Sequence, residues 1–256
     1  MAIQRLRRIG TQVTIEKDFD FNDDRIRYAD RIDFFTQIGL SPFLPVYYSR
    51  HPGENRFTEI TPYDRYNYIK VARRICLVVI RHIQVDQGVQ QMLDFCLTEI
   101  MDNVLIHSAY PKTFAGQGWC TAQHFPLTGA IRLIVADSGI GIHRALTSPA
   151  YSKYKGLSEW EAICHAVRKG VTNGEGMGFG LYATLAFIRL NGGEMFIYSG
   201  CHYGSLENGV FKIKTGAYWH GTIVYLRIKT NRVADYKSIL PPDYPLEEDF
   251  AYLNPS

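Results

Sequence analysis

The sequence predicts an α/β fold in which helices pack on a mixed and mostly antiparallel sheet. Three amphipathic segments with helical spacing supply the helices, at residues 63–83, 93–107 and 181–190. Five short apolar or alternating segments supply the strands, at residues 120–125, 130–136, 194–198, 210–214 and 222–228. Turn residues separate the last three of these segments, so we expect those strands to form an antiparallel meander.

Size and composition restrict the class of protein. A chain of 256 residues can form one substantial core, and a net charge of +3 with 21% charged residues does not favour a nucleic-acid partner. Five scattered cysteines are typical of free thiols in a reducing compartment, so we expect a cytoplasmic protein. The apolar run 75–80 lies between two arginines and is too short to cross a bilayer, so we expect no membrane segment.

The composition divides the chain into three parts. Residues 1–60 combine a possible strand at 12–16, a helical pattern ending at Gly39 and several prolines, and we expect them to form a cap on the main domain. Residues 61–230 hold the predicted helices and strands, and residues 231–256 have the prolines and acidic pair of a surface tail.

The helix at 93–107 has one polar feature of interest. Glu99 and Asn103 lie one turn apart, away from the apolar stripe. If buried, both need a protein partner or a bound ligand such as a hydrated metal ion. The alternative is a surface-facing polar pair on an amphipathic helix.

A second feature follows the strand at 130–136. The segment Asp-Ser-Gly-Ile-Gly places the carboxyl group of Asp137 at the end of that strand, in a tight turn. An ordinary turn would have the same sequence. Residues 142–173 then hold one predicted helix, 158–168, within loop-like sequence, and we expect a mobile flap.

A glycine-rich segment leads into the helix at 181–190. Its glycines alternate at positions Gly174, Gly176, Gly178 and Gly180, which suggests backbone N–H groups that bind an anion. A Rossmann fingerprint would need glycine where Phe179 stands, and no Gly-Lys pair of a Walker loop occurs in the chain. The adjacent cysteine and histidine residues elsewhere lack the spacing of a zinc site.

Taken in order, the chain has E-x-x-x-N on a helix, D-x-G-x-G after a strand, G-x-G-x-G before a helix, and Gly-Thr at the start of a late strand. This order resembles the GHKL ATPase superfamily over about residues 92–228. In organisation the chain looks most like stand-alone ATP-binding proteins such as the anti-sigma-factor kinases. The resemblance implies the Bergerat fold, a two-layer α/β sandwich with helices on one face and the nucleotide between the layers.

The resemblance also implies roles for the polar residues of the first motif. Asn103 would be the ligand of Mg²⁺, which prefers oxygen donors. Glu99 would orient or deprotonate the attacking water if ATP is hydrolysed. His107 would form part of the wall of the site.

The other motifs would bind the base and the phosphates. Asp137 would accept a hydrogen bond from the exocyclic amine of adenine, and Gly139 and Gly141 would allow close approach of the backbone to the purine. Thr222 would complete the base contact through its hydroxyl or a water, although strand propensity also explains a threonine there. The four alternating glycines would wrap the phosphates.

Departures from the family pattern affect the phosphate end of the site. Ile106 and Met177 stand where many members carry a basic residue, so a flap residue, Arg168 or Lys169, would supply positive charge. We do not expect a helical dimerisation domain with a phosphoacceptor histidine. We also do not expect a transducer domain.

Two functions follow from the resemblance. The first is a Mg²⁺-dependent ATP-binding regulator that hydrolyses ATP or phosphorylates a partner protein. The second is a catalytically silent module in which ATP or ADP gates a protein interface. The partner is unidentified, and the cap could mediate dimerisation.

Overall fold

The computed structural model describes residues 20, 22–39, 57–81, 87–108, 116–172, 174, 178–232 and 239, and gives only the backbone of residues 87–90. Its sheet has five strands in the order β1-β2-β3-β5-β4, and every neighbouring pair is antiparallel. The strands are β1 (Thr61–Tyr63), β2 (Gly118–Phe125), β3 (Ala130–Asp137), β4 (Glu194–Glu207) and β5 (Val210–Lys229). The mostly antiparallel sheet is therefore confirmed, and the described strands include no parallel pair.

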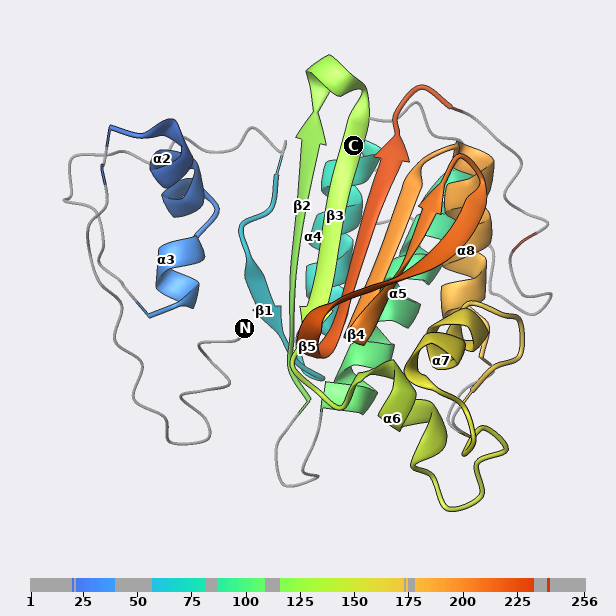
Figure 1. Ribbon diagram of the computed structural model, residues 1–256. Coiled ribbons are helices and arrows are strands. Elements are labelled where there is room, and N and C mark those ends of the chain that lie inside the picture. The colour runs from blue at the N-terminus through green and yellow to red at the C-terminus, as the bar shows by residue number, and fades with distance from the viewer. Residues whose placement is uncertain are drawn as a thin grey trace.

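Three helices cover one face of this sheet. They are α4 (Tyr68–Ile80), α5 (Gln87–Ser108) and α8 (Gly180–Asn191), and all three lie behind the strands in Figure 1. Inward-facing residues of the strands and the apolar stripes of the helices form one core, with Leu133, Met101 and Phe187 among its fully buried side chains. The predicted two-layer α/β sandwich is confirmed.

Two short helices at one end of the sheet complete this part of the fold. They are α6 (Gly141–Thr147) and α7 (Glu159–Ala166). The helix predicted at 158–168 corresponds to α7, but α6 was not predicted. It buries Ile142, Ala145 and Leu146, which have the i, i+3, i+4 spacing of one helix face. Seven residues are too few for this spacing to stand out in the sequence.

The segment around Tyr63 differs from its prediction. The sequence predicts a helix that starts at Tyr63, whereas Tyr63 ends strand β1 and pairs with Gly118 of β2. The helix begins five residues later, at Tyr68, after a turn in which the Asp64 side chain accepts hydrogen bonds from the backbone N–H groups of Tyr66 and Asn67. A three-residue strand is too short for its alternation to be recognised.

The last two strands form one long hairpin in place of the predicted meander. Residues 210–214 and 222–228, expected as separate strands, belong to the single strand β5. A tight turn with positive φ at Asn208 and Gly209 joins β4 to β5, and register shifts occur on both sides of Gly200. The irregularity at Gly200 allows the hairpin to bend and remain paired.

The N-terminal part has two helices where one was predicted. They are α2 (Asp24–Arg31) and α3 (Phe34–Gln37), separated at Asp33, which has a left-handed backbone with φ of 66°. The backbone of Ile32 accepts a hydrogen bond from the N–H of Ile60, and the Tyr28 hydroxyl donates to Gln123. The predicted strand at 12–16 and most of the predicted tail lie outside the described residues.

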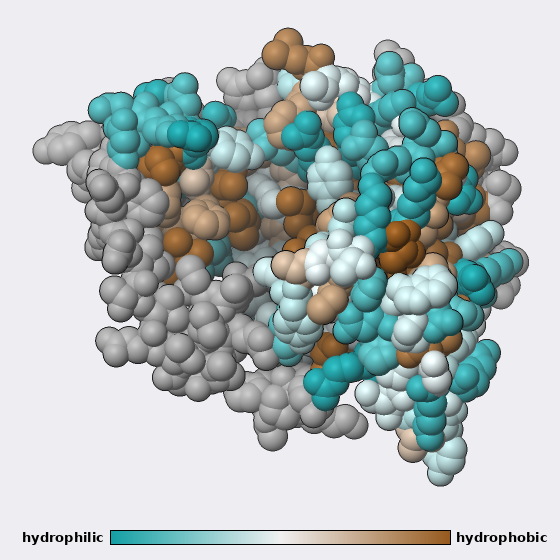
Figure 2. Space-filling view, viewed as in Figure 1, coloured by the Kyte–Doolittle hydropathy of each residue, from teal (hydrophilic) through white to brown (hydrophobic). Residues whose placement is uncertain are grey.

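Hydropathy differs between the regions of the visible surface. Figure 2 shows mainly hydrophilic residues over β4, β5 and α7 and hydrophobic residues in the hollow between α2–α3 and the strands beside them. That hollow is lined by Tyr28, Ile32, Phe57 and Phe125, among others. Within the described part of the chain, no helix combines the length and the apolar character needed to cross a bilayer.

Candidate functional site

The predicted site residues meet in one cavity of about 280 Å³ between the helical layer and the sheet. α5, α6, α8, the end of β3 and the residues Thr222 and Val224 within β5 supply its walls. The predicted residues that line it are Glu99, Asn103, His107, Asp137, Gly141, Gly178, Gly180 and Thr222. Gly139 lies behind its wall, Gly174 is exposed away from it, and Gly176 is outside the described residues.

The polar pair of α5 faces this cavity. Glu99 and Asn103 are partly buried and line the same wall, together with Asp102, which the sequence reasoning did not select. Burial raises the pKa of Glu99, and the nearby charge of Asp102 raises it further. Glu99 and Asp102 are three residues apart on a helix, and this spacing predicts that their side chains are neighbours.

The N-terminus of α8 lies directly against Glu99. A Cβ atom added to Gly180 would lie 2.6 Å from the Glu99 Cβ and 2.7 Å from its Oε2. Glycine is therefore required at this position if the first turn of α8 and the carboxyl group of Glu99 are to share one wall. Gly180 and Leu181 of that first turn line the cavity, and the N–H groups of a first helical turn, which lack partners within the helix, can bind an anion.

Asp137 is the most deeply buried polar group of the site. Its side chain is 1% exposed, and its Oδ1 accepts a hydrogen bond of 2.6 Å from the Gly139 N–H. Burial raises the pKa of Asp137 from 3.8 to about 7, although hydrogen bonds from the backbone N–H groups of Gly139 and Thr222 oppose the rise. Thr222 thus contacts Asp137 through its backbone amide.

Close backbone packing explains the glycines after Asp137. A Cβ atom on Gly139 would lie 2.2 Å from the carbonyl oxygen of His107, which also accepts a hydrogen bond of 3.1 Å from the Ile140 N–H. Gly141 has φ of +75°, a left-handed conformation that favours glycine. The end of α5 and the turn after β3 are therefore joined at His107.

Ser199 is a positioning residue that the sequence reasoning missed. Its buried hydroxyl accepts a hydrogen bond from the Ile142 N–H at 2.9 Å and donates to the Gly221 carbonyl oxygen at 3.0 Å. It therefore ties the start of α6 to β5 beside Asp137. A serine in an alternating strand gives no indication of such a role, because its partners are 57 and 22 residues away.

The glycine-rich segment closes on itself before α8 begins. The Gly170 N–H donates to the Gly178 carbonyl oxygen at 2.9 Å, and a Cβ atom on Gly178 would lie 2.4 Å from the Val171 carbonyl oxygen. Lys169 stands beside this closure with its Nζ 5.4 Å from the centre of the Phe179 ring. A flap cation therefore lies next to a residue of the cavity wall.

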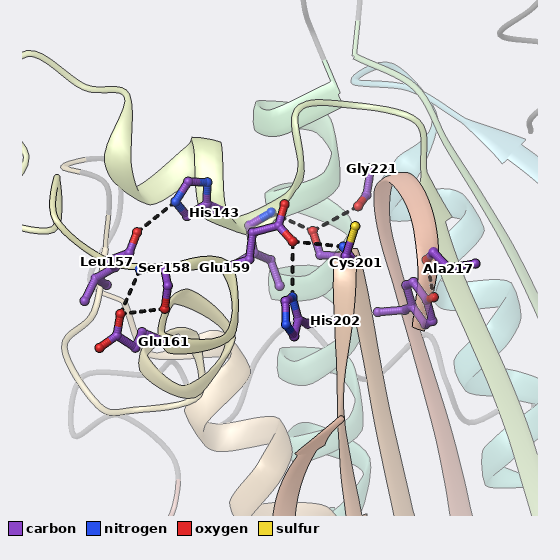
Figure 3. Close-up of polar contacts among 12 residues, drawn as sticks. His143, Leu157, Ser158, Glu159, Glu161, Cys201, His202, Ala217 and Gly221 are labelled. Carbon is purple, nitrogen blue, oxygen red and sulfur yellow. Dashed lines mark hydrogen bonds and ion pairs between the residues drawn. The ribbon is translucent and has the colours of Figure 1, made fainter. Parts of the chain in front are cut away.

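The flap predicted at 142–173 is held to the rest of the domain by side-chain contacts (Figure 3). Glu159 at the start of α7 accepts hydrogen bonds from the Cys201 N–H at 3.0 Å and from His202 Nδ1 at 3.2 Å. Within the flap itself, His143 Nε2 lies 2.8 Å from the Leu157 carbonyl oxygen, and the Ser158 N–H donates to Glu161. The hydrogen bond from the Cys201 N–H and, to a smaller extent, the contact with His202 lower the pKa of Glu159.

The donors present fit a nucleotide with a magnesium ion. Among the described residues, no group of three or more His, Cys, Asp or Glu side chains is arranged to hold a metal by itself. Mg²⁺ is commonly bound by one or two protein oxygens together with substrate phosphates and water, and the side chains of Asn103 and Glu99 offer such oxygens. The apolar walls and the single buried carboxyl group suit a flat base with one hydrogen-bonding edge.

Protonation of Asp137 predicts a pH dependence of stability. Between pH 3.8 and about 7 the carboxyl group is protonated in the folded protein and ionised in the unfolded chain, so stability falls as pH rises through this range. The resulting decrease in the free energy of unfolding has an upper limit on the order of 4 kcal/mol. We expect Asp137→Asn to show a smaller loss in urea unfolding across this range. An unchanged pH slope, equal to that of the exposed control Glu194→Gln, would contradict the assignment.

Comparison with known proteins identifies the domain that carries this site. The family model described as histidine kinase-, DNA gyrase B-, and HSP90-like ATPase matches residues 88–232, more than half of the 256-residue chain. Among curated proteins no relative was found. The matched residues include α6, α8, β3, β5 and nearly all of α5, which line the cavity. The chain therefore belongs to the histidine kinase-, gyrase B- and HSP90-like ATPase family, and this part of it is an ATP-binding domain of the GHKL type.

Proposed function

We propose that the protein is a Mg²⁺-dependent ATP-binding regulator that hydrolyses ATP or transfers its terminal phosphoryl group to a partner protein. The observation that carries this proposal is the single cavity in which α5 presents Glu99 and Asn103, β3 presents Asp137, and α8 begins at Gly180. A carboxyl group for the base, an amide for a metal and free N–H groups for phosphate are thus available in one place.

At the base end, the proposed role of Asp137 is to accept a hydrogen bond from the adenine amine. Its burial supports this role, because a buried carboxyl group needs donors and gains most from one that a ligand supplies. The Gly139 and Thr222 N–H groups hold the carboxyl group in place. The apolar side chains of Ile142 and Val224 line the space for the ring.

At the phosphate end, the chain supplies backbone N–H groups of α8 and one flap cation, Lys169. Asn103 would hold the magnesium ion, with Glu99 beside it. A magnesium ion, when bound, neutralises phosphate charge and polarises the terminal phosphoryl group. Lys169 can move from the Phe179 ring to the phosphates, because its long side chain is exposed.

Glu99 is the proposed general base. Its pKa is raised towards neutral pH, which makes the carboxylate a better acceptor of a proton from water or from a partner's hydroxyl. Gly180 lets the carboxyl group lie against the first turn of α8, where the phosphates would bind. The proton acceptor and the anion site are therefore adjacent.

Nucleotide affinity tests the assignment of the two ends. Asn103→Ala and Asp137→Ala should each weaken ATP binding at least about tenfold in calorimetric titrations with Mg²⁺, because each removes a polar contact in a buried site. Glu207→Ala, in the exposed hairpin turn, is the control. The proposal fails if wild-type protein gives no heat with ATP or ADP, or if both variants bind like the control.

Phosphate release tests the role of Glu99. Glu99→Gln keeps the shape of the side chain but removes its basicity, so ATP should still bind while phosphate release or transfer falls by about a hundredfold or more. Glu194→Gln, on the other side of the sheet, should leave both unchanged. Binding without turnover in the wild type and in both variants would support the catalytically silent, nucleotide-gated module instead.

We further propose that residues 61–230 are the ATPase domain and that the cap, residues 1–60, binds the protein partner in the cytoplasm, whether another protein or a second copy of this chain. The hydrophobic hollow beside α2, lined by Tyr28, Ile32 and Phe57, supports a protein contact there. Residues 231–256 would form a tail, which contacts the core at least at Ile239, whose side chain is buried.

Co-purification tests the assignment of the cap. In the presence of an ATP analogue and Mg²⁺, Phe57→Ala should reduce the amount of bound partner while ATP affinity is kept. Tyr151→Ala removes an aromatic ring that is fully exposed elsewhere and serves as the control. Equal partner recovery with both variants would contradict a role for this hollow.

A further inference from the structure

Three residues on neighbouring strands form one rung across the sheet beneath α5. Tyr63 of β1 pairs with Gly118 of β2, and Gly118 pairs with Asp137 of β3. Paired residues in antiparallel strands point to the same face, so all three face the helical layer. Tyr63 and Asp137 are each 1% exposed.

The glycine in the middle of this rung allows the tyrosine to reach towards the aspartate. A Cβ atom on Gly118 would lie 2.4 Å from Cζ of Tyr63 and 2.5 Å from its hydroxyl oxygen. The hydroxyl group therefore lies over Gly118, one strand spacing from Asp137. Any larger residue at position 118 would displace the ring.

The hydroxyl group of Tyr63 is buried and has no hydrogen-bond partner among the described residues. A buried hydroxyl group without a partner is costly, and the strongest acceptor on this rung is the carboxyl group of Asp137 on β3, on the far side of Gly118. The Asp137 Oδ1 is held by Gly139 and lies beside Gly221 of β5. Tyr63 approaches from the opposite side, that of β2.

We propose that Tyr63 is a positioning residue for base recognition: its hydroxyl donates to a water that in turn donates to the Asp137 carboxylate, and so keeps that group ionised and oriented towards the amino group of a purine. This inference rests on the proposed role of Asp137 in reading the base. Tyr63 precedes the residues 88–232 that match the family model. Burial is the main cause that raises the pKa of Tyr63, and the nearby Cys120 and Asp137 raise it further.

The first test needs no nucleotide. The titration of Asp137, followed by NMR of protein labelled at aspartate carboxyl carbons, should move upwards by about one pH unit in Tyr63→Phe, because the ionised form loses a donor. The other titratable groups around the site, Glu99, Asp102, His107, Cys120 and His220, are the same in both proteins. Tyr154→Phe, at another buried tyrosine, should leave the midpoint unchanged.

The second test asks whether this contact affects base recognition. At pH 7, Tyr63→Phe should weaken binding of ATP about fivefold, because the ionised fraction of Asp137 falls from about one half to about one tenth. The loss should disappear near pH 9, where Asp137 is ionised in both proteins. A purine riboside triphosphate that lacks the 6-amino group should bind both proteins equally.

The outcomes separate this inference from the proposed function. An Asp137 midpoint that Tyr63→Phe does not move overturns the inference, whether or not ATP binds. Equal losses for ATP and the analogue at every pH would also overturn it, because they indicate a purely structural tyrosine. A wild-type protein that binds ATP and the analogue equally would refute base reading by Asp137, and with it this role of Tyr63. If Tyr63→Phe does not fold, Gly118→Ala, which displaces the same ring, should raise the Asp137 midpoint likewise.

Discussion

The buried carboxyl group of Asp137 is the constraint on which the site depends. A carboxyl group removed from water is costly unless donors surround it, and here the backbone N–H groups of Gly139 and Thr222 supply two. Both donors require the turn after β3 and the start of the part of β5 that pairs with β3 to approach closely. Gly221 permits this approach, because a Cβ atom there would lie 2.4 Å from the Asp137 carbonyl oxygen. The polar group and the backbone around it therefore form one unit.

A second close contact places the phosphate end of the cavity. α5 and α8 pack side by side in the helical layer, and Gly180 brings the first turn of α8 against Glu99. Both ends of the cavity are thus fixed to α5. His107 holds the base end, and Glu99 holds the phosphate end. One long helix, anchored in the core by residues such as Met101, sets the distance between them. The ATP-binding character of the domain follows from this shared support.

Much of the fold was predictable because its elements are long and periodic. Helix α5 and strands β2 and β3 contain their predicted ranges, since their apolar patterns extend over six or more residues, although α5 begins six residues before its predicted start. The pattern was insufficient for β1 and α6, which are short, and for β5, whose continuity depends on its pairing with β4 around the irregularity at Gly200. The break at Asp33 depends on one backbone angle that no hydrophobic pattern records.

By itself, the sequence determined the types of the longer elements, the order of the motifs and the residues with the required chemistry, because each of these depends on local spacing. Only the tertiary structure decided which groups meet. Ser199 joins α6 to β5, and Tyr63 shares a rung with Asp137 across Gly118, although these residues are far apart in the chain. Such contacts depend on the register between strands and on whether a glycine, such as Gly118, leaves room between the two side chains. Neither condition can be recognised from local sequence.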